Sequence, residues 1–515
     1  MPSPRGARTG PPAGTAPAVS RSGRLTPVVP ALMSLGLGCW GLSRQDSMWR
    51  DESVTYQMAH RSMTDMARAL SHIDAVHGLY YVLMHAVFSL WDGGLFALRL
   101  PSVLAIALAT WLVGAVATRH ADALTGLLAG LVFALLPIVQ QYAQEGRSYA
   151  LVTASVAGTL LAFDRALARD RARDWLLYGV LALLAALLHE FAILALLANA
   201  VTLRLTKAPR TLVRRWAVAA AAATTGLLPL AILSLGQSDE QLGWLNRPSV
   251  GAWLLYAGVV VLGAACARFA FGGARKRYGP FGDGGYERGR HPLVALALPV
   301  LALPSLLLMA ISLVHPWYVD RYCVYSYLGL ALVAGPALRR CLTLLAARPL
   351  PYRVAMTALP LALASAVLAP WYVLMRTPEA RKDDVVAVTR AADELGEPGD
   401  AVLFEPARRR EWSLSYPRTW GRFHDIALAV SPAASGTLQG SEVSAGRVKK
   451  RLLAQRRVLA LRDPAGQPLD DTAAERAKRE VLDRYFTSCG TRTVHGARVT
   501  LYARAHACAS HHDGR

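Results

Sequence analysis

The sequence has little charge and few cysteines for its length of 515 residues. Only 18% of the residues are charged, whereas 53% are hydrophobic and the mean hydropathy is +0.29. This composition excludes an ordinary soluble protein, which would carry more charge and shorter apolar runs. Six cysteines are too few for a disulfide scaffold, and no CxxC or His/Cys spacing indicates a structural zinc site.

Long apolar segments recur along the first 375 residues, and many have the length that crosses a bilayer. We expect about eleven transmembrane helices, at approximately 25–43, 95–118, 122–140, 148–165, 175–188, 190–205, 213–236, 251–271, 292–314, 322–345 and 354–375. The pair His189-Glu190 is interpreted as a turn between two short spans, because a charged pair at mid-membrane is costly. The predicted fold class is an α-helical polytopic membrane protein.

The net charge of +21 would suit nucleic-acid binding, but its distribution argues against that partner. The basic residues concentrate in short loops on one side of the predicted bundle, for example at 165–173, 204–215 and 275–277. By the positive-inside rule that side is cytoplasmic. We therefore predict a multi-pass protein of the plasma membrane with a cytoplasmic N-terminus, an extracytoplasmic C-terminus and no nucleic-acid partner.

The two ends of the chain differ from the membrane region, residues 25–375. Residues 1–24 are rich in Pro, Gly, Ala and Ser and contain no acidic residue, which is typical of a disordered basic arm. Residues 376–515 have no spanning run and alternate helix and strand patterns, which predicts a small extracytoplasmic α/β domain. Helices are expected near 383–396 and 472–486, and strands near 401–404, 458–461 and 498–502. Only Cys489 and Cys508 make a plausible disulfide there.

The first external loop, residues 44–94, contains the adjacent carboxylates Asp51 and Glu52. Acidic residues in such a loop can simply solvate it, or one of them can act as a general base. A base needs a low dielectric and nearby charge to tune its pKa, and a cleft at the membrane surface supplies both. Further along, the apolar residues between Val54 and Leu70 predict an amphipathic helix lying on the surface.

Three further polar stretches fall at predicted outer helix ends, at residues 74–81, 141–151 and 317–322. In the second stretch, Glu145 and Arg147 can pair with each other, although an ordinary loop does not need this set of residues. In the third, Arg321 can extend toward lipid headgroups or clamp a lipid-linked phosphate, for which arginine is well suited.

Together the stretches form an ordered set: Arg50-Asp51-Glu52, Asp74…His77-x-Leu79-Tyr80-Tyr81, Arg99-Leu100-Pro101-Ser102, Gln144-Glu145-x-Arg147-Ser148-Tyr149, His189 and Arg321-Tyr322. This set resembles the dolichyl-phosphate-mannose–protein mannosyltransferase-like family of GT-C glycosyltransferases over roughly residues 25–375. The resemblance implies an inverting membrane transferase of the mannosyltransferase type. Its partners would be the membrane lipid, a polyprenyl-phosphate sugar donor and an extracytoplasmic acceptor, whether protein, glycan or lipid.

The resemblance also implies roles for individual residues. Asp51 would deprotonate the acceptor hydroxyl, and Glu52 would order the acceptor or support that base. The residues implied for binding the donor phosphate and the substrate are His77, Tyr81, Gln144, Glu145, Arg147, His189 and Arg321. Two positions depart from the family pattern. His77 precedes Gly78 where many members have His-Pro-Pro, and Glu190 stands where relatives more often have an aromatic residue.

No Asp-x-Asp sequence occurs in the first loop, so neither an obligatory metal nor another cofactor is predicted. Two other classes stay open, namely a transporter or lipid flippase and a non-catalytic envelope-assembly protein. A transporter predicts charged residues deep within spans and related halves. Here the ionisable residues crowd the outer helix ends and no internal repeat is evident, so the transferase is favoured. The sequence indicates no oligomeric state.

Overall fold

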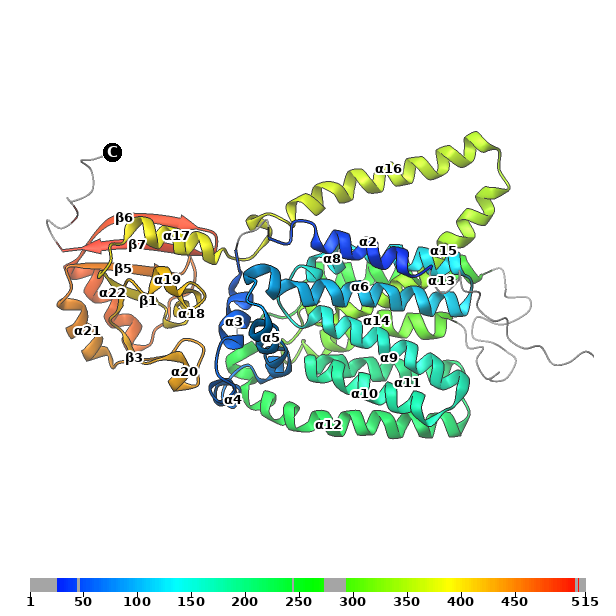
Figure 1. The fold of residues 1–515 in the computed structure, drawn as a ribbon, viewed down its shortest axis with the longest axis horizontal. Helices are drawn as coiled ribbons and strands as arrows, with labels where there is room; N and C mark the ends of the chain where they lie inside the picture. Colours follow the sequence, from blue (N-terminus) through cyan, green and yellow to red (C-terminus); the bar gives the residue numbers. More distant parts are fainter. Residues whose placement is uncertain (1–25, 44–46, 243–244, 273–292, 505–507, 509–515) are drawn as a thin grey trace, which may run out of the picture.

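The computed structural model describes residues 26–43, 47–242, 245–272, 293–504 and 508. The predicted disordered arm, residues 1–24, lies outside the described residues. Figure 1 shows a bundle of long helices with a smaller α/β domain beyond one end, and α3 and α4 lie where the two meet. The predicted fold class, a helical membrane protein with a C-terminal α/β domain, is confirmed.

The membrane region consists of helices. In chain order they are α2 (Val28–Cys39), α3 (Arg50–Ala59), α4 (Met63–Leu70), η1 (Ala75–His77), α5 (Gly78–Leu90), α6 (Gly94–His120), α7 (Ala123–Ala134), α8 (Pro137–Ala143), α9 (Tyr149–Arg169), α10 (Ala172–Leu188), η2 (Glu190–Ile193), α11 (Leu194–Leu205), α12 (Arg210–Leu242), α13 (Val250–Phe271), α14 (Leu293–Ile311), η4 (Asp320–Ser326), α15 (Tyr327–Ala346) and α16 (Leu350–Leu374).

Within the described ranges, seven helices are long and apolar enough to cross a membrane, and the pair α7 and α8, bent by 67°, makes an eighth if it is one span. Each of the eleven predicted spans overlaps an apolar helix, but α2 and α11 have only 12 residues and α10 has 17. The count of eleven is therefore not confirmed. The predicted break after α10 is present, because His189 has extended backbone angles (φ −165°, ψ 118°).

Close helix contacts hold the bundle together. A Cβ atom at Gly329 of α15 would lie 2.3 Å from the carbonyl oxygen of Ala297 on α14, so only glycine permits this approach. Gly335, two turns further along α15, faces Ala129 of α7 in the same way, at 2.7 Å from its Cβ. These contacts fix α15, and with it the η4 segment that carries Arg321.

The first loop differs from the single surface helix predicted between Val54 and Leu70. The chain forms two helices, α3 and α4, separated at His60–Ser62, and Ser62 caps α4 by accepting a hydrogen bond from the Asp65 amide. Met58 and Met66 are buried, at 0% and 1% exposure. The prediction was wrong because these apolar side chains pack into the protein and not against lipid.

The C-terminal domain has a five-stranded sheet of order β2-β1-β5-β7-β6, in which β1 is parallel to β2 and β5, and β7 is antiparallel to β5 and β6. The strands are β1 (Ala401–Glu405), β2 (His424–Asp425), β5 (Arg457–Arg462), β6 (Thr487–Val494) and β7 (Ala497–Ala503), and β3 (Leu428–Val430) pairs with β4 (Ser441–Glu442) apart from them. The helices are α17 (Val385–Leu395), α18 (Arg410–Ser413), α19 (Pro417–Trp420), α20 (Pro432–Ser435), α21 (Ala445–Leu453) and α22 (Ala473–Tyr485).

Alternate residues of the central strands face two separate cores. Val402 and Phe404 of β1 pack with α17, whereas Leu403 packs with α21 and α22 on the other face. The three predicted strands and two predicted helices are all present. Strand β6 was not predicted, because an edge strand with mostly exposed polar residues lacks the alternating pattern.

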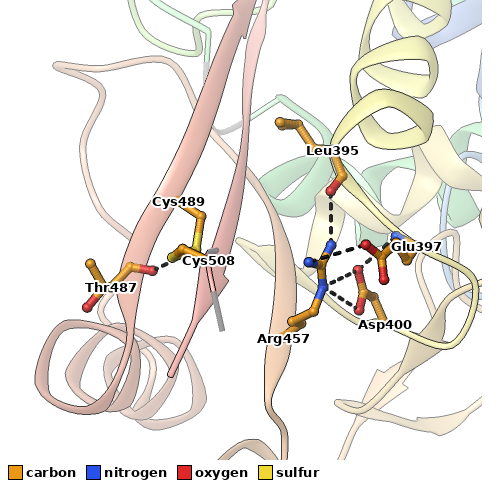
Figure 2. Close-up of a disulfide and its surroundings, with 7 residues drawn as sticks. All are labelled: Leu395, Glu397, Asp400, Arg457, Thr487, Cys489 and Cys508. Atoms are coloured by element: carbon orange, nitrogen blue, oxygen red, sulfur yellow. Dashed lines mark hydrogen bonds and ion pairs between the residues drawn. A yellow bond between two sulfur atoms is a disulfide. The ribbon is translucent and has the colours of Figure 1, made fainter. Parts of the chain in front are cut away.

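Cys489 of β6 and Cys508, the only pair that the sequence marks as plausible, form a disulfide (Figure 2). Close to it, Arg457 of β5 pairs with Asp400 at 3.0 Å and with Glu397 at 3.5 Å, and donates a hydrogen bond to the Leu395 carbonyl. This arginine fixes the turn between α17 and β1.

The linker between α16 and α17 is bonded to the membrane region along its length. Arg376 donates hydrogen bonds to the carbonyls of Trp40 and Leu37, at 2.6 and 2.7 Å. Asp383 accepts a hydrogen bond of 2.6 Å from the Arg50 amide, and Asp384 accepts one of 2.5 Å from the Ser47 hydroxyl. The two domains are therefore joined by a fixed segment.

Candidate active site

The site is built around the first turn of α3. Trp49 has extended backbone angles and precedes the helix, so Asp51 and Glu52 lie where helix dipoles favour negative charge. Neighbouring residues of a helix point about 100° apart, so the two carboxylates cannot face the same space. They have different surroundings.

Glu52 is fully buried in an ion pair with Arg99 of α6. The Arg99 Nε and Nη2 atoms donate to the two carboxylate oxygens at 2.7 Å each, and both side chains are at most 1% exposed. The Glu52 carboxylate also accepts from the amides of Gly146, at 2.9 Å, and Trp49, at 3.4 Å. Glu52 thus ties α3 to α6 and to the loop before α9, and is not among the residues that line the cavity beside Asp51.

Asp51 faces a cavity of about 490 Å³ between the two domains. The cavity is lined by Arg50, Asp51, Val54, Ile73, Asp74, Val76, His77, Arg147, Tyr149, Arg321, Tyr322, Arg408, Glu411, Leu438, Gln439 and Asp470. The Asp51 side chain is 24% exposed, and its Oδ2 atom lies 3.4 Å from Nη2 of Arg321. Burial alone raises the pKa of Asp51, but Arg321 and Arg147 outweigh it and hold this pKa below its ordinary value.

Arg321 is supported by aromatic rings and keeps a free donor. Its guanidinium carbon lies 5.6 Å from the Trp49 ring centre and 5.7 Å from those of Tyr149 and Tyr322. Its buried Nε atom has no hydrogen-bond partner among the described residues. A planar cation held in this way, with a spare N–H, can bind an anionic ligand in the cavity.

Arg147, in the loop before α9, fixes the other side of the cavity. Its Nη1 atom donates to the Tyr81 hydroxyl at 3.0 Å, and to the Asp51 carbonyl and the Thr55 hydroxyl at 3.4 Å each. Its Nε atom is also buried, with no partner in the part of the chain that the structure describes. Tyr81 itself is fully buried and does not line the cavity, so it holds Arg147 and Asp74 in place.

Asp74 is a cavity carboxylate that was not among the predicted site residues. It has a left-handed backbone conformation (φ 62°, ψ 28°), which is uncommon for a residue other than glycine. Its carboxyl group accepts a hydrogen bond from the Tyr81 hydroxyl. Burial raises its pKa to about 6, against the opposing effect of Arg147. The polar stretch 74–81 was recognised in the sequence, but nothing in it separates Asp74 from a solvating loop residue.

His77 and His189 form part of an aromatic cluster, with ring centres 5.7 Å apart. His77 lines the cavity, whereas His189 lines a second, adjoining cavity of about 220 Å³ that shares Val76 and Tyr322 with the first. Burial, followed by the charge of Arg147, holds the pKa of His77 well below its ordinary value and lowers that of His189 to about 3. Both imidazoles are therefore neutral, and can offer hydrogen bonds but not charge to a phosphate.

Gln144 and Glu145 lie behind the site and not in the cavity. The Gln144 amide donates to the carbonyls of Gly38 and Trp40, at 2.8 Å each. Glu145 pairs with Arg381 of the linker at 3.6 Å, and burial raises its pKa to about 7. These residues anchor the loop that carries Arg147. Glu190, to which no role was assigned from the sequence, accepts a hydrogen bond of 2.7 Å from Ser234 of α12.

Among the described residues, no three His, Cys, Asp or Glu side chains are grouped so that they would hold a metal ion. The arrangement instead combines one ionised carboxylate, a second carboxyl group with a raised pKa, and two buried arginines with free N–H groups. It can accept a proton on a carboxylate and stabilise negative charge beside two arginines at the wall of one cavity.

Comparisons with known proteins bear on the family and the fold of the chain. The family model described as dolichyl-phosphate-mannose-protein mannosyltransferase matches residues 79–233. The structure of ArnT from Cupriavidus metallidurans bound to undecaprenyl phosphate is similar, with a TM-score of 0.59 and 13% sequence identity over 95% of this chain and 100% of that chain. The apo structure of that ArnT gives the same score and identity over 94% and 98%. No curated protein sequence matches significantly.

At 13% identity the likeness to ArnT shows the fold. The chain is therefore a multi-pass membrane protein with the GT-C fold, and its residues 79–233 match the dolichyl-phosphate-mannose-protein mannosyltransferase family, as the sequence resemblance implied.

Proposed function

We propose that the protein is an inverting glycosyltransferase that moves a sugar from a polyprenyl-phosphate carrier to a hydroxyl group outside the cytoplasm. The observation that carries this proposal is that ionised Asp51 lies beside Arg321, with 3.4 Å between Oδ2 and Nη2, at the wall of a cavity at the ends of membrane helices. A single displacement needs a base for the incoming hydroxyl and a cation for the departing phosphate. This cavity offers both.

Asp51 is the base. Its lowered pKa keeps the carboxylate ionised at neutral pH, and its partial exposure leaves it accessible to an acceptor. In the reaction the acceptor oxygen bonds to the anomeric carbon of the sugar, and the hydroxyl proton passes to an Asp51 oxygen. The bond between that carbon and the phosphate oxygen breaks with its electron pair, which leaves a polyprenyl phosphate.

Arg321 and Arg147 bind that phosphate. Each has a buried Nε–H group with no partner in the described ranges, so each can donate to a phosphate oxygen without losing a bond seen there. Their charge stabilises the leaving group most strongly when the bond has broken, which lowers the barrier. The neutral His77 contributes a hydrogen bond at most.

The carrier's hydrocarbon chain fits the adjoining cavity. That cavity is largely apolar and is lined in part by Phe191, Leu227 and Leu235, and it shares Val76 and Tyr322 with the main cavity. A lipid that placed its phosphate near Arg321 would have its first apolar units there. In ArnT of known structure the bound lipid is undecaprenyl phosphate, which makes this lipid the natural probe.

The basic loops support an orientation with the cavity on the extracytoplasmic side of the plasma membrane. The N-terminus would then be cytoplasmic and the C-terminal domain extracytoplasmic. The sugar is a hexose or a pentose, with mannose as the first candidate from the matching family model.

Two variants test the proposal. Arg321→Ala should weaken binding of undecaprenyl phosphate to the purified protein at least about tenfold, because a charged hydrogen bond is lost. Asp51→Asn should bind the lipid normally but abolish the product in a deletion strain complemented with the variant, as measured by mass spectrometry of envelope glycans, glycolipids and glycoproteins. Arg214→Ala, at an exposed position of α12, is the control. Normal product from Asp51→Asn would refute the assigned base.

A further inference from the structure

The outer wall of the main cavity belongs to the C-terminal domain. Arg408, Glu411, Leu438, Gln439 and Asp470 come from three separate segments of that domain and line the same space as Asp51. Four of the five are charged or amide side chains. None was predicted as a site residue, and none is used in the reaction described above.

The domain is fixed against the helix that carries Asp51. Glu411 pairs with Arg50 of α3 at 3.3 Å, and the Ser415 and Ser53 hydroxyl groups lie 2.5 Å apart. Arg61, just after α3, donates to the Thr437 carbonyl at 2.9 Å. The wall therefore has a definite position relative to Asp51.

The segment that carries Gln439 is held from within its own domain. Arg410, only 2% exposed, donates to the Gln439 carbonyl at 3.1 Å and pairs with Asp425 and Glu442. This buried bonding sets the course of the segment before any ligand binds. A preorganised polar surface loses less entropy on binding than a mobile one.

Asp470 retains hydrogen-bonding capacity. One of its oxygens accepts from the Thr472 amide at 2.9 Å, and a carboxylate has further acceptor sites. Gln439 adds an amide with two donors and an acceptor. Planar carboxylate, amide and guanidinium groups match the neighbouring hydroxyl groups of a sugar ring, whereas a lipid acceptor would call for an apolar wall.

We propose that this wall is the acceptor site and that the acceptor is a carbohydrate, with Gln439 and Asp470 hydrogen bonding to its hydroxyl groups and determining specificity. The inference rests on the proposed function, since it assigns the second substrate of the same reaction. A site built to hydrogen bond to hydroxyl groups discriminates strongly against molecules that lack them.

The test compares Gln439→Ala and Asp470→Asn with matched controls in the same domain, Gln455→Ala and Asp471→Asn. Asp471 is 80% exposed, and neither control residue lines the cavity. Three measurements are made on the full-length protein. They are the affinity for undecaprenyl phosphate, saturation-transfer NMR with a panel of methyl glycosides and with an N-acetylated serine amide, and the product level in the complemented deletion strain.

We expect the wild-type protein to give saturation-transfer signals with methyl glycosides and none with the serine compound. The double variant Gln439→Ala/Asp470→Asn should lose most of the glycoside signal and reduce the product about tenfold, because the amide hydrogen bonds are lost and a charged acceptor becomes a neutral one. Its undecaprenyl phosphate affinity should match that of the controls, which would place both residues on the acceptor side.

Unchanged glycoside signals and product in the double variant would overturn the proposal. So would a parallel loss of undecaprenyl phosphate binding, which would assign the residues to the donor, or a saturation signal from the serine compound alone, which would indicate a protein acceptor. Failure of the wild-type protein to bind undecaprenyl phosphate would refute the proposed donor instead, and is read separately from the glycoside signals.

Discussion

Replacing Arg99 with alanine is expected to lower the unfolding free energy of the protein strongly. The substitution removes both hydrogen bonds to the Glu52 carboxylate, together with those to the carbonyls of Leu42 and Ser47, at 2.9 Å each. It leaves a carboxylate that is 0% exposed without its counter-ion. Breaking a buried ion pair from one side costs about 3–5 kcal/mol. We expect a loss of unfolding free energy in that range.

The assay is equilibrium unfolding in detergent, with Arg68→Ala as the control. Arg68 forms a comparable ion pair with Asp65, but its side chain is 44% exposed, so its removal should cost less than about 1 kcal/mol. Glu52→Gln should cost less than Arg99→Ala, and the double variant less than the sum of the two, because the pair acts as a unit.

The pH dependence of stability is a second test of the ion pair between Glu52 and Arg99. Burial raises the pKa of Glu52, but Arg99 outweighs it and the pKa is lowered from 4.5. The stabilisation is then present above pH 4.5 and is lost as the pH falls through the lower folded-state pKa. The reasoning is refuted if Arg99→Ala unfolds like the control, or if the stability difference persists unchanged in strong acid.

Three further predictions follow from the site and the C-terminal domain. The pKa of Asp74 is raised from 3.8 to about 6, so the wild type loses stability as the pH rises through this window. In unfolding experiments Asp74→Asn should be more stable than the wild type at pH 7, by up to about 3 kcal/mol, and equally stable below pH 3.8. Arg147→Lys should weaken undecaprenyl phosphate binding about tenfold, since lysine lacks the planar fork; equal affinity would contradict a role in phosphate binding. Replacing Cys489 and Cys508 with serine should cost about 3 kcal/mol for a loop of 19 residues, and dithiothreitol should lower the unfolding midpoint of the wild type alone.

The sequence predicts the outer helix ends well because polar residues there interrupt apolar runs. Asp51, His77, Arg147 and Arg321 were all singled out in this way, and the structure brings them to one cavity. The different environments of the adjacent Asp51 and Glu52 were harder to predict. Only the helical rotation between Asp51 and Glu52, and the position of Arg99 on another helix, separate the exposed carboxylate from the buried one.

The outer wall of the cavity was beyond prediction for a different reason. Gln439 and Asp470 follow Asp51 by hundreds of residues, and each sits in an ordinary polar loop. Only the docking of the C-terminal domain brings them to the cavity. The count of eleven spans is not confirmed, because α2, α10 and α11 are shorter than the helices identified as long enough to cross a membrane.

The bonded linker has a consequence for the order of events during turnover. Because Arg376, Asp383 and Asp384 attach it to the membrane region, the C-terminal domain does not act as a hinged lid over Asp51. Under the proposed function, a carrier lipid would enter from within the bilayer and an acceptor from the aqueous side. Separate routes would let either substrate arrive first, and initial-rate kinetics should then fit a random-order mechanism.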